Sequence, residues 1–139
     1  MNDASWDWPP RISATRVQEL HSAALAHAGG RPGVLNAGLL ESAVGGALTA
    51  ALYANESGEP DPLYIAAHLL CYLARNHAFN DGNKRVAWLA CEDQLRMCRL
   101  RVIASTDDAE RLVLDVVRGD VKSEDVIVWL AERLAPYDP

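Results

Sequence analysis

Residues 63–91 read LYIAAHLLCYLARNHAFNDGNKRVAWLAC and consist of two apolar runs joined by a short polar linker. The first run, 63–74, is interrupted only by His68, and the second, 86–91, carries no charge. An apolar run without a polar face is typical of a central helix that other elements cover on every side. The linker, 76–85, instead holds a histidine, an aspartate, amide side chains and two adjacent cations, and this contrast needs an explanation.

The composition indicates a helical domain with its own core. The chain has 139 residues, half of them hydrophobic, so we expect one domain over residues 1–139 that needs no disulfide or metal for stability. The sequence contains a single phenylalanine, so the core must come mainly from leucine, alanine and valine. Small and unbranched side chains of this kind favour closely packed helices.

The charge balance and the chain start exclude several classes. A formal net charge of −6 argues against a general nucleic-acid binder, although it leaves room for a local positive pocket. The start, MNDASWDWPP, lacks the basic and apolar segments of a secretion signal. The run 63–74 is shorter than the roughly 20 residues that span a bilayer. We therefore expect a soluble, cytoplasmic protein that binds no membrane and no nucleic acid directly.

The cysteines are expected to be free thiols. Their number is odd and no two have the C-x-x-C spacing, so neither a zinc site nor a disulfide framework is indicated. All three lie in apolar helical runs: Cys71, Cys91 and Cys98.

Caps and glycines divide the chain into about six helices, and the predicted fold class is all-α. Ser13, Asn36, Asp61 and Ser105 are candidate N-caps, and Pro62 suits a first helical position. The expected helices cover 13–28, a stretch from 36 whose end Gly45 and Gly46 leave open, 61–76, 83–98, a stretch from 105, and a stretch from 123 that ends before Pro136. Residues 99–103, RLRVI, are expected to form a short extended link.

The two cations of the linker stand where a helix normally avoids them. Gly82 separates the third and fourth helices, so Lys84 and Arg85 fall in the first turn of the fourth. Cations at a helix N-terminus cost about 0.3–1 kcal/mol each, and a local rule broken in this way usually marks a functional site. A bound anion would compensate, because free N–H groups, the helix dipole and both side chains attract a phosphate.

The same linker holds groups suited to phosphate chemistry. Asp81 would be repelled by a phosphate unless a hard cation such as Mg²⁺ lies between them. His77 can serve as a general base, and Phe79 is expected to anchor the loop in the core. Plainer interpretations stay open for each residue taken alone. Asp81 or Asn83 can be an N-cap in a common turn, His77 can bond a free carbonyl at a helix end, and the cations can be solvated.

The order and spacing of these residues match a family. The run H-A-F-N-D-G-N-K-R resembles the loop signature of the Fic/Doc superfamily, H-P-F-x-(D/E)-G-N-G-R-x-x-R, and more closely its Doc branch. Lys84 replaces the second glycine, which is typical of Doc, and Trp88 stands in place of the second arginine. Ala78 replaces a frequent proline. The resemblance covers about residues 16–134 and implies a Fic-like helical bundle with the active-site loop between helices three and four.

The resemblance also implies an activity. Doc proteins are toxins of toxin–antitoxin pairs that transfer the γ-phosphate of ATP to a Ser or Thr hydroxyl of elongation factor Tu and so block translation. A protein kinase-type phosphotransferase of this kind would use His77, Asp81 and Lys84 as catalytic residues. Asp81 would hold Mg²⁺, and the nucleotide would be bound by Gly82, Asn83, Lys84 and Arg85. Since the chain shows no inhibitory S/T-x-x-x-E-(G/N) pattern, control would come from a cognate antitoxin whose helix folds on binding.

Two other functions stay open. One is Fic-type AMP transfer to a protein hydroxyl, although Trp88 replaces the arginine that would hold the β and γ phosphates. The other is a catalytically silent helical binding module that retains the motif.

A few residues outside the linker have open or structural interpretations. Arg75 can touch substrate or stabilise a helix end, and the polar loop 55–62 can guide a target segment or simply face solvent. Trp6 and Trp8 are expected to pack the N-terminal segment on the body. Three histidines are interpreted as structural: His21, His27 and His68.

Overall fold

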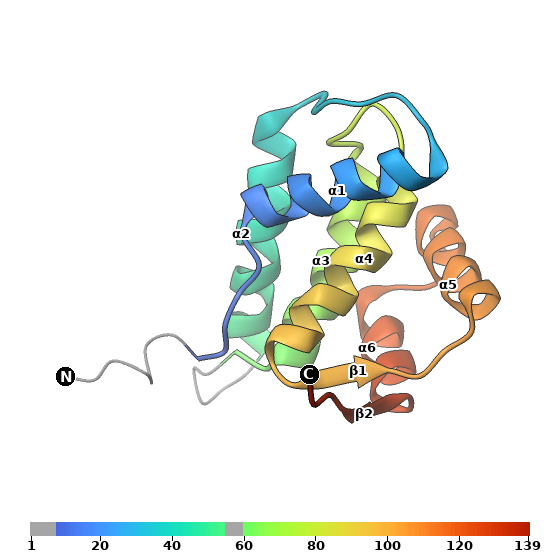
Figure 1. Cartoon of the computed structure of the whole chain (residues 1–139). Helices are drawn as coiled ribbons and strands as arrows, with labels where there is room; N and C mark the ends of the chain where they lie inside the picture. The colour runs from blue at the N-terminus through green and yellow to red at the C-terminus, as the bar shows by residue number, and fades with distance from the viewer. Residues whose placement is uncertain (1–7, 55–59) are drawn as a thin grey trace.

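The fold is that of a helical bundle, and the computed structural model describes residues 8–54 and 60–139 (Figure 1). Within these residues the chain forms six helices and two short strands, which confirms the all-α class. In chain order they are α1 (Ala14–Ala28), α2 (Ala37–Ala54), α3 (Pro62–Asn76), α4 (Asn83–Met97), β1 (Leu100–Val102), α5 (Thr106–Arg118), α6 (Ser123–Ala131) and β2 (Leu134–Pro136).

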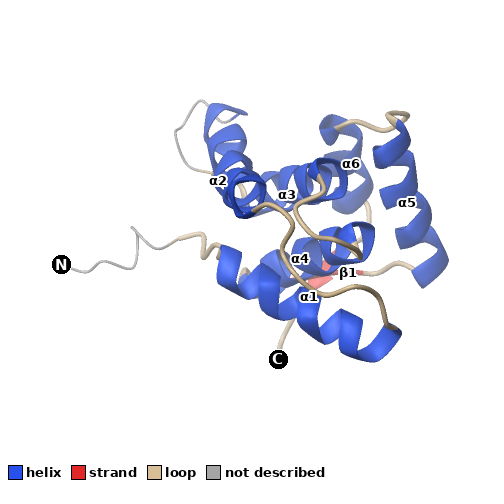
Figure 2. Cartoon of the chain, turned by 90° about the horizontal axis from the view of Figure 1, so that it is seen from above, coloured by secondary structure: helices blue, strands red, loops and turns tan. Residues whose placement is uncertain are grey.

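Helix α3 is the centre of the bundle. Asp61 caps it by accepting from the Leu63 N–H at 2.8 Å, and Pro62 occupies its first position, as expected. Figures 1 and 2 show α2, α4, α5 and α6 arranged around it. Eight of its residues are buried: Ile65, Ala66, Ala67, Leu69, Leu70, Cys71, Leu73 and Ala74. The apolar run 63–74 therefore predicts the central helix correctly.

The capping residues at three other helix starts are also as expected. The side chains of Ser13 and Ser105 accept from the N–H groups three residues later, at 3.0 and 3.1 Å. Asn36 accepts from the Leu39 N–H at 3.0 Å. At α6 the N-cap is Lys122, not Ser123, and the Lys122 N–H donates to the Asp125 carboxylate.

Helix α2 continues through Gly45 and Gly46 to Ala54. The ring of Tyr72 on α3 lies so close to Gly46 that a Cβ there would be 3.2 Å from the ring. Gly46 thus allows close packing instead of ending the helix. By length and mean hydropathy, 1.3 over 18 residues, α2 alone among the described residues could cross a membrane. One side of it packs in the core, through Leu40, Ala43, Ala47 and Ala51.

The extended link at 99–103 is one half of a small sheet. Strand β1 pairs antiparallel with β2, with Arg101 opposite Ala135. Helix α6 ends at Ala131, and the chain then returns along β1. This pairing is not predictable from local sequence, because its two partners are more than thirty residues apart in the chain.

The core consists of small aliphatic side chains, as the composition predicts, and one cluster of buried residues draws on all six helices. Phe79 is only 2% exposed and is the largest of its fully buried side chains. The cysteines are buried and free, and burial raises the pKa of each thiol. The expectation of free thiols is thus confirmed.

The N-terminal segment is fixed to α4 by a buried glutamine. The Gln94 side chain is fully buried, accepts from the Ile12 N–H at 2.9 Å and donates to the Pro10 carbonyl at 2.8 Å. Trp8 does not pack as expected, since it is 56% exposed, and Trp6 lies outside the described residues. Hydrogen bonds rather than aromatic packing therefore hold this segment.

Arg75 joins the end of α3 to the end of α5. Its guanidinium donates to the carbonyls of Val116 and Val121, both at 3.2 Å. These bonds favour the helix-end interpretation of Arg75, since the Val116 carbonyl lies in the last turn of α5 and Val121 follows that helix.

Replacing Gln94 with alanine should destabilise the protein. The Ile12 N–H and the Pro10 carbonyl would each lose a buried partner, at about 1–3 kcal/mol per group, and a cavity would remain. We expect the free energy of unfolding in urea to fall by roughly 2–4 kcal/mol. Gln18→Ala, at an exposed position of α1, is the matched control and should change little. Equal, small effects of both substitutions would contradict this account.

Candidate active site

The loop between α3 and α4 is bounded by two residues in the left-handed conformation. His77 ends α3 with φ 52° and ψ 49°, and Gly82 precedes α4 with φ 74°. This conformation is normal for glycine but uncommon for histidine, and such outliers gather at functional sites. The two residues turn the chain so that His77, Asp81 and the start of α4 face one side.

Asn83 holds the loop from within. Its side-chain Oδ1 accepts from the Phe79 N–H at 3.1 Å, and its Nδ2 donates to the Phe79 carbonyl at 3.0 Å. The buried Phe79 ring anchors the same point in the core, as expected. Helix α4 has Gly82 as N-cap with no side-chain cap bond, so neither Asp81 nor Asn83 caps it. The plain capping interpretation of these two residues is therefore wrong.

A second segment, 31–36, lies along the loop and pairs with it like a strand. Val34 forms an isolated antiparallel bridge with Phe79, and the Asn80 N–H donates to the Gly33 carbonyl at 3.2 Å. The N–H groups of Leu35 and Asn36 donate to the Ala78 carbonyl at 2.8 and 3.0 Å. This segment was not predicted from the sequence, where its only signal is its content of glycine and proline before the cap of α2.

The carboxylate of Asp81 is fixed between two main-chain donors. Its Oδ2 accepts from the Arg31 N–H at 3.2 Å and its Oδ1 from the Gly82 N–H at 2.9 Å. These bonds lower the pKa of the Asp81 carboxyl, the bond from Arg31 contributing most. Because the side chain is exposed, it stays anionic and accessible at neutral pH.

The loop lies in a cleft of about 910 Å³ between α1, α4 and α5. In Figure 1 the loop itself is at the top of the molecule, where α3 passes into α4 behind α1. All the site residues expected from the sequence line this cleft: His77, Asp81, Gly82, Asn83, Lys84 and Arg85.

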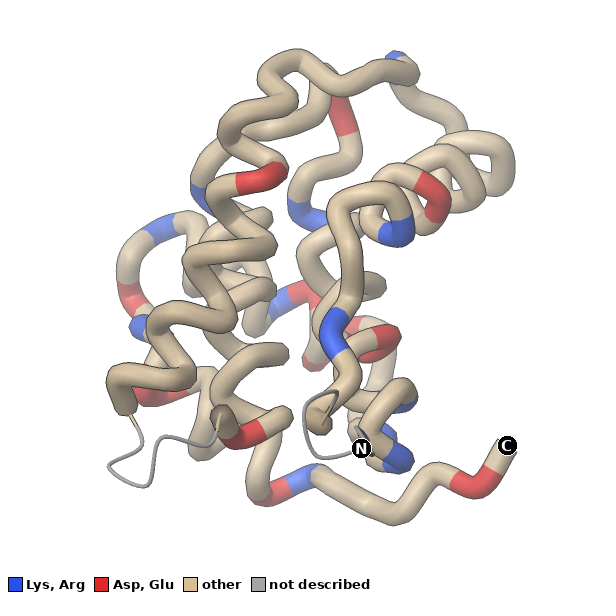
Figure 3. The backbone as a smooth tube through the Cα atoms, turned by 90° about the vertical axis from the view of Figure 1, so that its left-hand side faces the viewer, with Lys and Arg blue, Asp and Glu red and all other residues tan. Residues whose placement is uncertain are grey.

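The cations of the cleft are not neutralised by protein carboxylates. Lys84 and Arg85 are both exposed, and neither forms an ion pair within residues 8–54 and 60–139. Figure 3 shows acidic and basic positions interspersed along the backbone, so this adjacent pair is a local feature of an acidic protein. At a helix N-terminus the pair favours an anion.

One wall of the cleft is apolar. Trp88 is half-buried and meets the ring of Trp129 edge-on, with the centroids 6.0 Å apart. Leu89 of α4, Leu25 of α1 and Val113 of α5 also line the cleft. The position after the first turn of α4 therefore offers an aromatic surface in place of a second arginine.

The remaining residues singled out in the sequence are two histidines, His27 and His68, and the polar loop 55–62. His27 is exposed and His68 half-buried, with a pKa that burial lowers. Residues 55–59 of the polar loop lie outside the described residues. Pro60 and Asp61, which follow them, are at the opposite end of α3 from His77, about 22 Å along a 15-residue helix. The described segment beside the active-site loop is 31–36.

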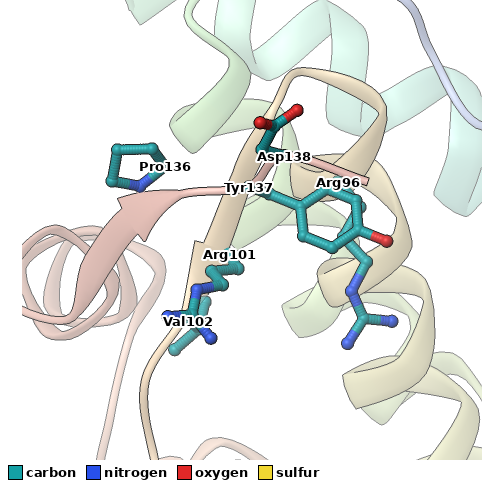
Figure 4. A pocket seen from close by; sticks show the side chains of 6 residues that line it. All are labelled: Arg96, Arg101, Val102, Pro136, Tyr137 and Asp138. Carbon is teal, nitrogen blue, oxygen red and sulfur yellow. The ribbon is translucent and has the colours of Figure 1, made fainter.

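A second hollow of about 450 Å³ lies at the β1–β2 end of the molecule (Figure 4). It is lined by Arg96, Arg101, Val102, Pro136, Tyr137 and Asp138. Arg96 is paired with Glu92 at 3.6 Å and lies 5.7 Å from the centre of the Tyr137 ring. This hollow contains none of the expected site residues, so the loop cleft is the candidate active site.

Comparison with known proteins agrees with this geometry. A model of the Fic/DOC family matches residues 11–95, a range that contains the whole loop. The chain is 37% identical over 105 residues to "Toxin Doc" of Mycolicibacterium smegmatis, which covers 74% of this chain and 79% of that protein. It is 30% identical over 115 residues to "Protein kinase doc" of Escherichia phage P1, with coverage of 83% and 88%. The chain therefore belongs to the Fic/DOC family.

Proposed function

We propose that this protein is a Doc-like toxin of a toxin–antitoxin pair that transfers the γ-phosphate of ATP to a Ser or Thr hydroxyl of a protein. One observation carries the proposal: Lys84 and Arg85, unpaired within the described residues, line the same cleft as the exposed His77. The printed names of the two relatives, a toxin and a protein kinase, support it.

The first turn of α4 supplies the phosphate-binding groups. Its main-chain N–H groups have no partner within the helix and carry the positive end of the dipole. The guanidinium of Arg85 can bind phosphate oxygens in a bidentate manner, and Lys84 adds a compact charge. Charge neutralisation and positioning provide most of the catalysis in phosphoryl transfer, so such a cradle can suffice.

His77 is the proposed general base. The imidazole takes the proton of the Ser or Thr hydroxyl as the hydroxyl oxygen attacks the γ-phosphorus. The bond from the γ-phosphorus to the oxygen bridging it to the β-phosphate breaks, and ADP leaves. His77 has a left-handed backbone conformation and lines the same cleft as the start of α4.

Asp81 fits a magnesium site that is completed by the nucleotide. Its carboxylate is exposed, lines the cleft and has a lowered pKa. The described residues contain no group of three or more His, Cys, Asp or Glu suited to a metal, so phosphate oxygens and water would supply the other ligands. When bound, Mg²⁺ neutralises charge on the phosphates.

Gly82 and Asn83 act mainly by shaping this cradle. The Asn83 amide is bonded to Phe79 on both sides, and the Gly82 N–H is bonded to Asp81. We therefore assign direct phosphate contact to Lys84, Arg85 and the free N–H groups of the first turn.

The wider biological role follows from the same proposal. The target would be elongation factor Tu, and a small antitoxin that folds into a helix on binding would hold the toxin inactive. Both ATP and the translation machinery occur in the cytoplasm, which is where the protein would act.

AMP transfer is the second candidate, and the position of Trp88 weighs against it. A Fic-type enzyme needs a second cation to hold the β and γ phosphates, whereas Trp88 is packed against Trp129. A silent binding module is the third candidate, and the exposed, unpaired site residues weigh against that one.

Incubation with elongation factor Tu and Mg²⁺-ATP should separate the three candidates. With ATP labelled on the γ-phosphate we expect label on the target, and His77→Ala should reduce the rate by about 10²–10⁴-fold because the general base is lost. His27→Ala, at an exposed histidine of α1, is the matched control. Transfer only from α-labelled ATP would establish AMP transfer, and no transfer while an antitoxin peptide binds would favour the silent module.

Removing either cation should weaken nucleotide binding. Lys84→Ala and Arg85→Ala should each raise the Kd for Mg²⁺-ATP by roughly 10–100-fold at low salt, since a charged hydrogen bond contributes about 1.5–3 kcal/mol. The effect should shrink as salt rises. Arg111→Ala removes the same charge from an exposed site on α5 and should leave the Kd unchanged. Calorimetric titration provides the measurement, and equal Kd values for all variants would contradict the phosphate cradle.

A further inference from the structure

His21 is a buried histidine that lies outside the active-site loop and outside α3 and α4, the helices that flank the loop. It lies on α1, is only 3% exposed and reaches the loop from the side of α1. Its imidazole is stacked on the ring of Phe79, with centroids 3.9 Å apart and planes inclined by 16°. A side chain that served only to fill the core would need no polar atom here, because burying an unpaired ring nitrogen is unfavourable.

The polar atom of His21 has a specific partner in the loop. Its Nε2 lies 2.7 Å from the carbonyl oxygen of Asp81. A carbonyl only accepts hydrogen bonds, so Nε2 must carry the proton and donate it. This short bond therefore fixes the tautomer of His21 and the direction of the Asp81 carbonyl together.

The hydrogen bond from His21 to the Asp81 carbonyl also orients the N–H of Gly82, because both groups belong to one peptide unit. The carbonyl of Asp81 and the N–H of Gly82 belong to the same planar, trans peptide unit and point in opposite directions. The Gly82 N–H donates to Oδ1 of Asp81 at 2.9 Å. With the carbonyl held by His21, that N–H is aimed at the carboxylate, and α4 begins directly after it.

The imidazole of His21 also lies beside Gly82. A Cβ at Gly82 would lie 3.5 Å from Nε2 of His21, so the imidazole already packs against the glycine backbone. Gly82 also needs its positive φ of 74° to turn into α4. The ring thus bonds the Asp81 carbonyl and lies next to the glycine that leads from Asp81 to the cations.

We infer that His21 is a positioning residue for the proposed phosphotransfer: its Nε2–H orients the Asp81–Gly82 peptide, and its ring stacks on Phe79. The Asp81 carboxylate and the first turn of α4 thereby keep the alignment that a nucleotide needs. His21 does not itself touch the reacting atoms in this account. The activity readouts below rest on the proposed function, whereas the spectroscopic readouts do not.

Two substitutions separate the hydrogen bond from the stacking. His21→Gln keeps an N–H donor at a similar reach, and His21→Phe keeps a flat ring without the donor. If the bond positions the loop, His21→Phe should lower kcat by about tenfold or more with a smaller change in the KM for ATP, since small misplacements reduce rate. His21→Gln should retain kcat within about threefold. His27→Ala, on the same helix, should behave as the unchanged protein.

Nuclear magnetic resonance tests the inference without any turnover. In the unchanged protein we expect His21 as the Nε2–H tautomer, and a Gly82 amide signal that moves in His21→Phe but stays close to its place in His21→Gln. An Nε2 without a proton would overturn the inference even if both variants failed to fold. Equal losses of kcat and melting temperature in both variants, with an unmoved Gly82 signal, would overturn it as well.

The two proposals can fail separately. If no phosphate transfer is found with any acceptor while the Gly82 signal follows the donor at position 21, the proposed function fails and the positioning role of His21 stands. If transfer occurs but His21→Phe retains full kcat, the positioning role fails and the proposed function stands.

Discussion

Between α3 and α4 the chain reverses direction beside a fully buried phenylalanine, so the polar main-chain groups of the loop need partners other than bulk water. They find them in other parts of the fold: the Asn83 side chain at Phe79, the segment 31–36 at Ala78 and Asn80, and His21 at Asp81. A buried main-chain group without a partner costs about 1–3 kcal/mol, and this cost restricts the loop to one shape. The placement of every candidate catalytic group depends on that shape.

Electrostatics adds a second constraint at the same place. Helices α5 and α6 begin with carboxylates in the first turn, as the helix dipole favours, whereas α4 begins with Lys84 and Arg85. Under the proposed function, a bound phosphate would offset the unfavourable interaction of these two cations with the helix dipole. Two nearby cations raise the local potential for phosphate in a protein that is acidic as a whole. The site is thus positive where the phosphates would lie and negative at Asp81.

Much of the fold could be predicted from local patterns. The apolar run of α3 indicates a central helix, and the caps Ser13, Asp61 and Ser105 lie where side-chain chemistry places them. Local sequence patterns did not predict the elements whose structure depends on a residue far away in the chain. Gly46 lies inside α2 because the Tyr72 ring packs against it, and β1 needs β2, which follows it by more than thirty residues. Neither partner is visible in a short window of sequence.

The candidate site divides in the same way. The residues from His77 to Arg85 are contiguous, so the sequence by itself determined the chemistry of the loop and its place between two helices. Tertiary structure alone decided which groups hold that loop, namely His21 from α1, the Arg31 N–H, and the strand-like segment beside Phe79. The physical reason is that a side chain's type is a local property, whereas a hydrogen-bond partner for a buried carbonyl is supplied by whichever segment packs against it.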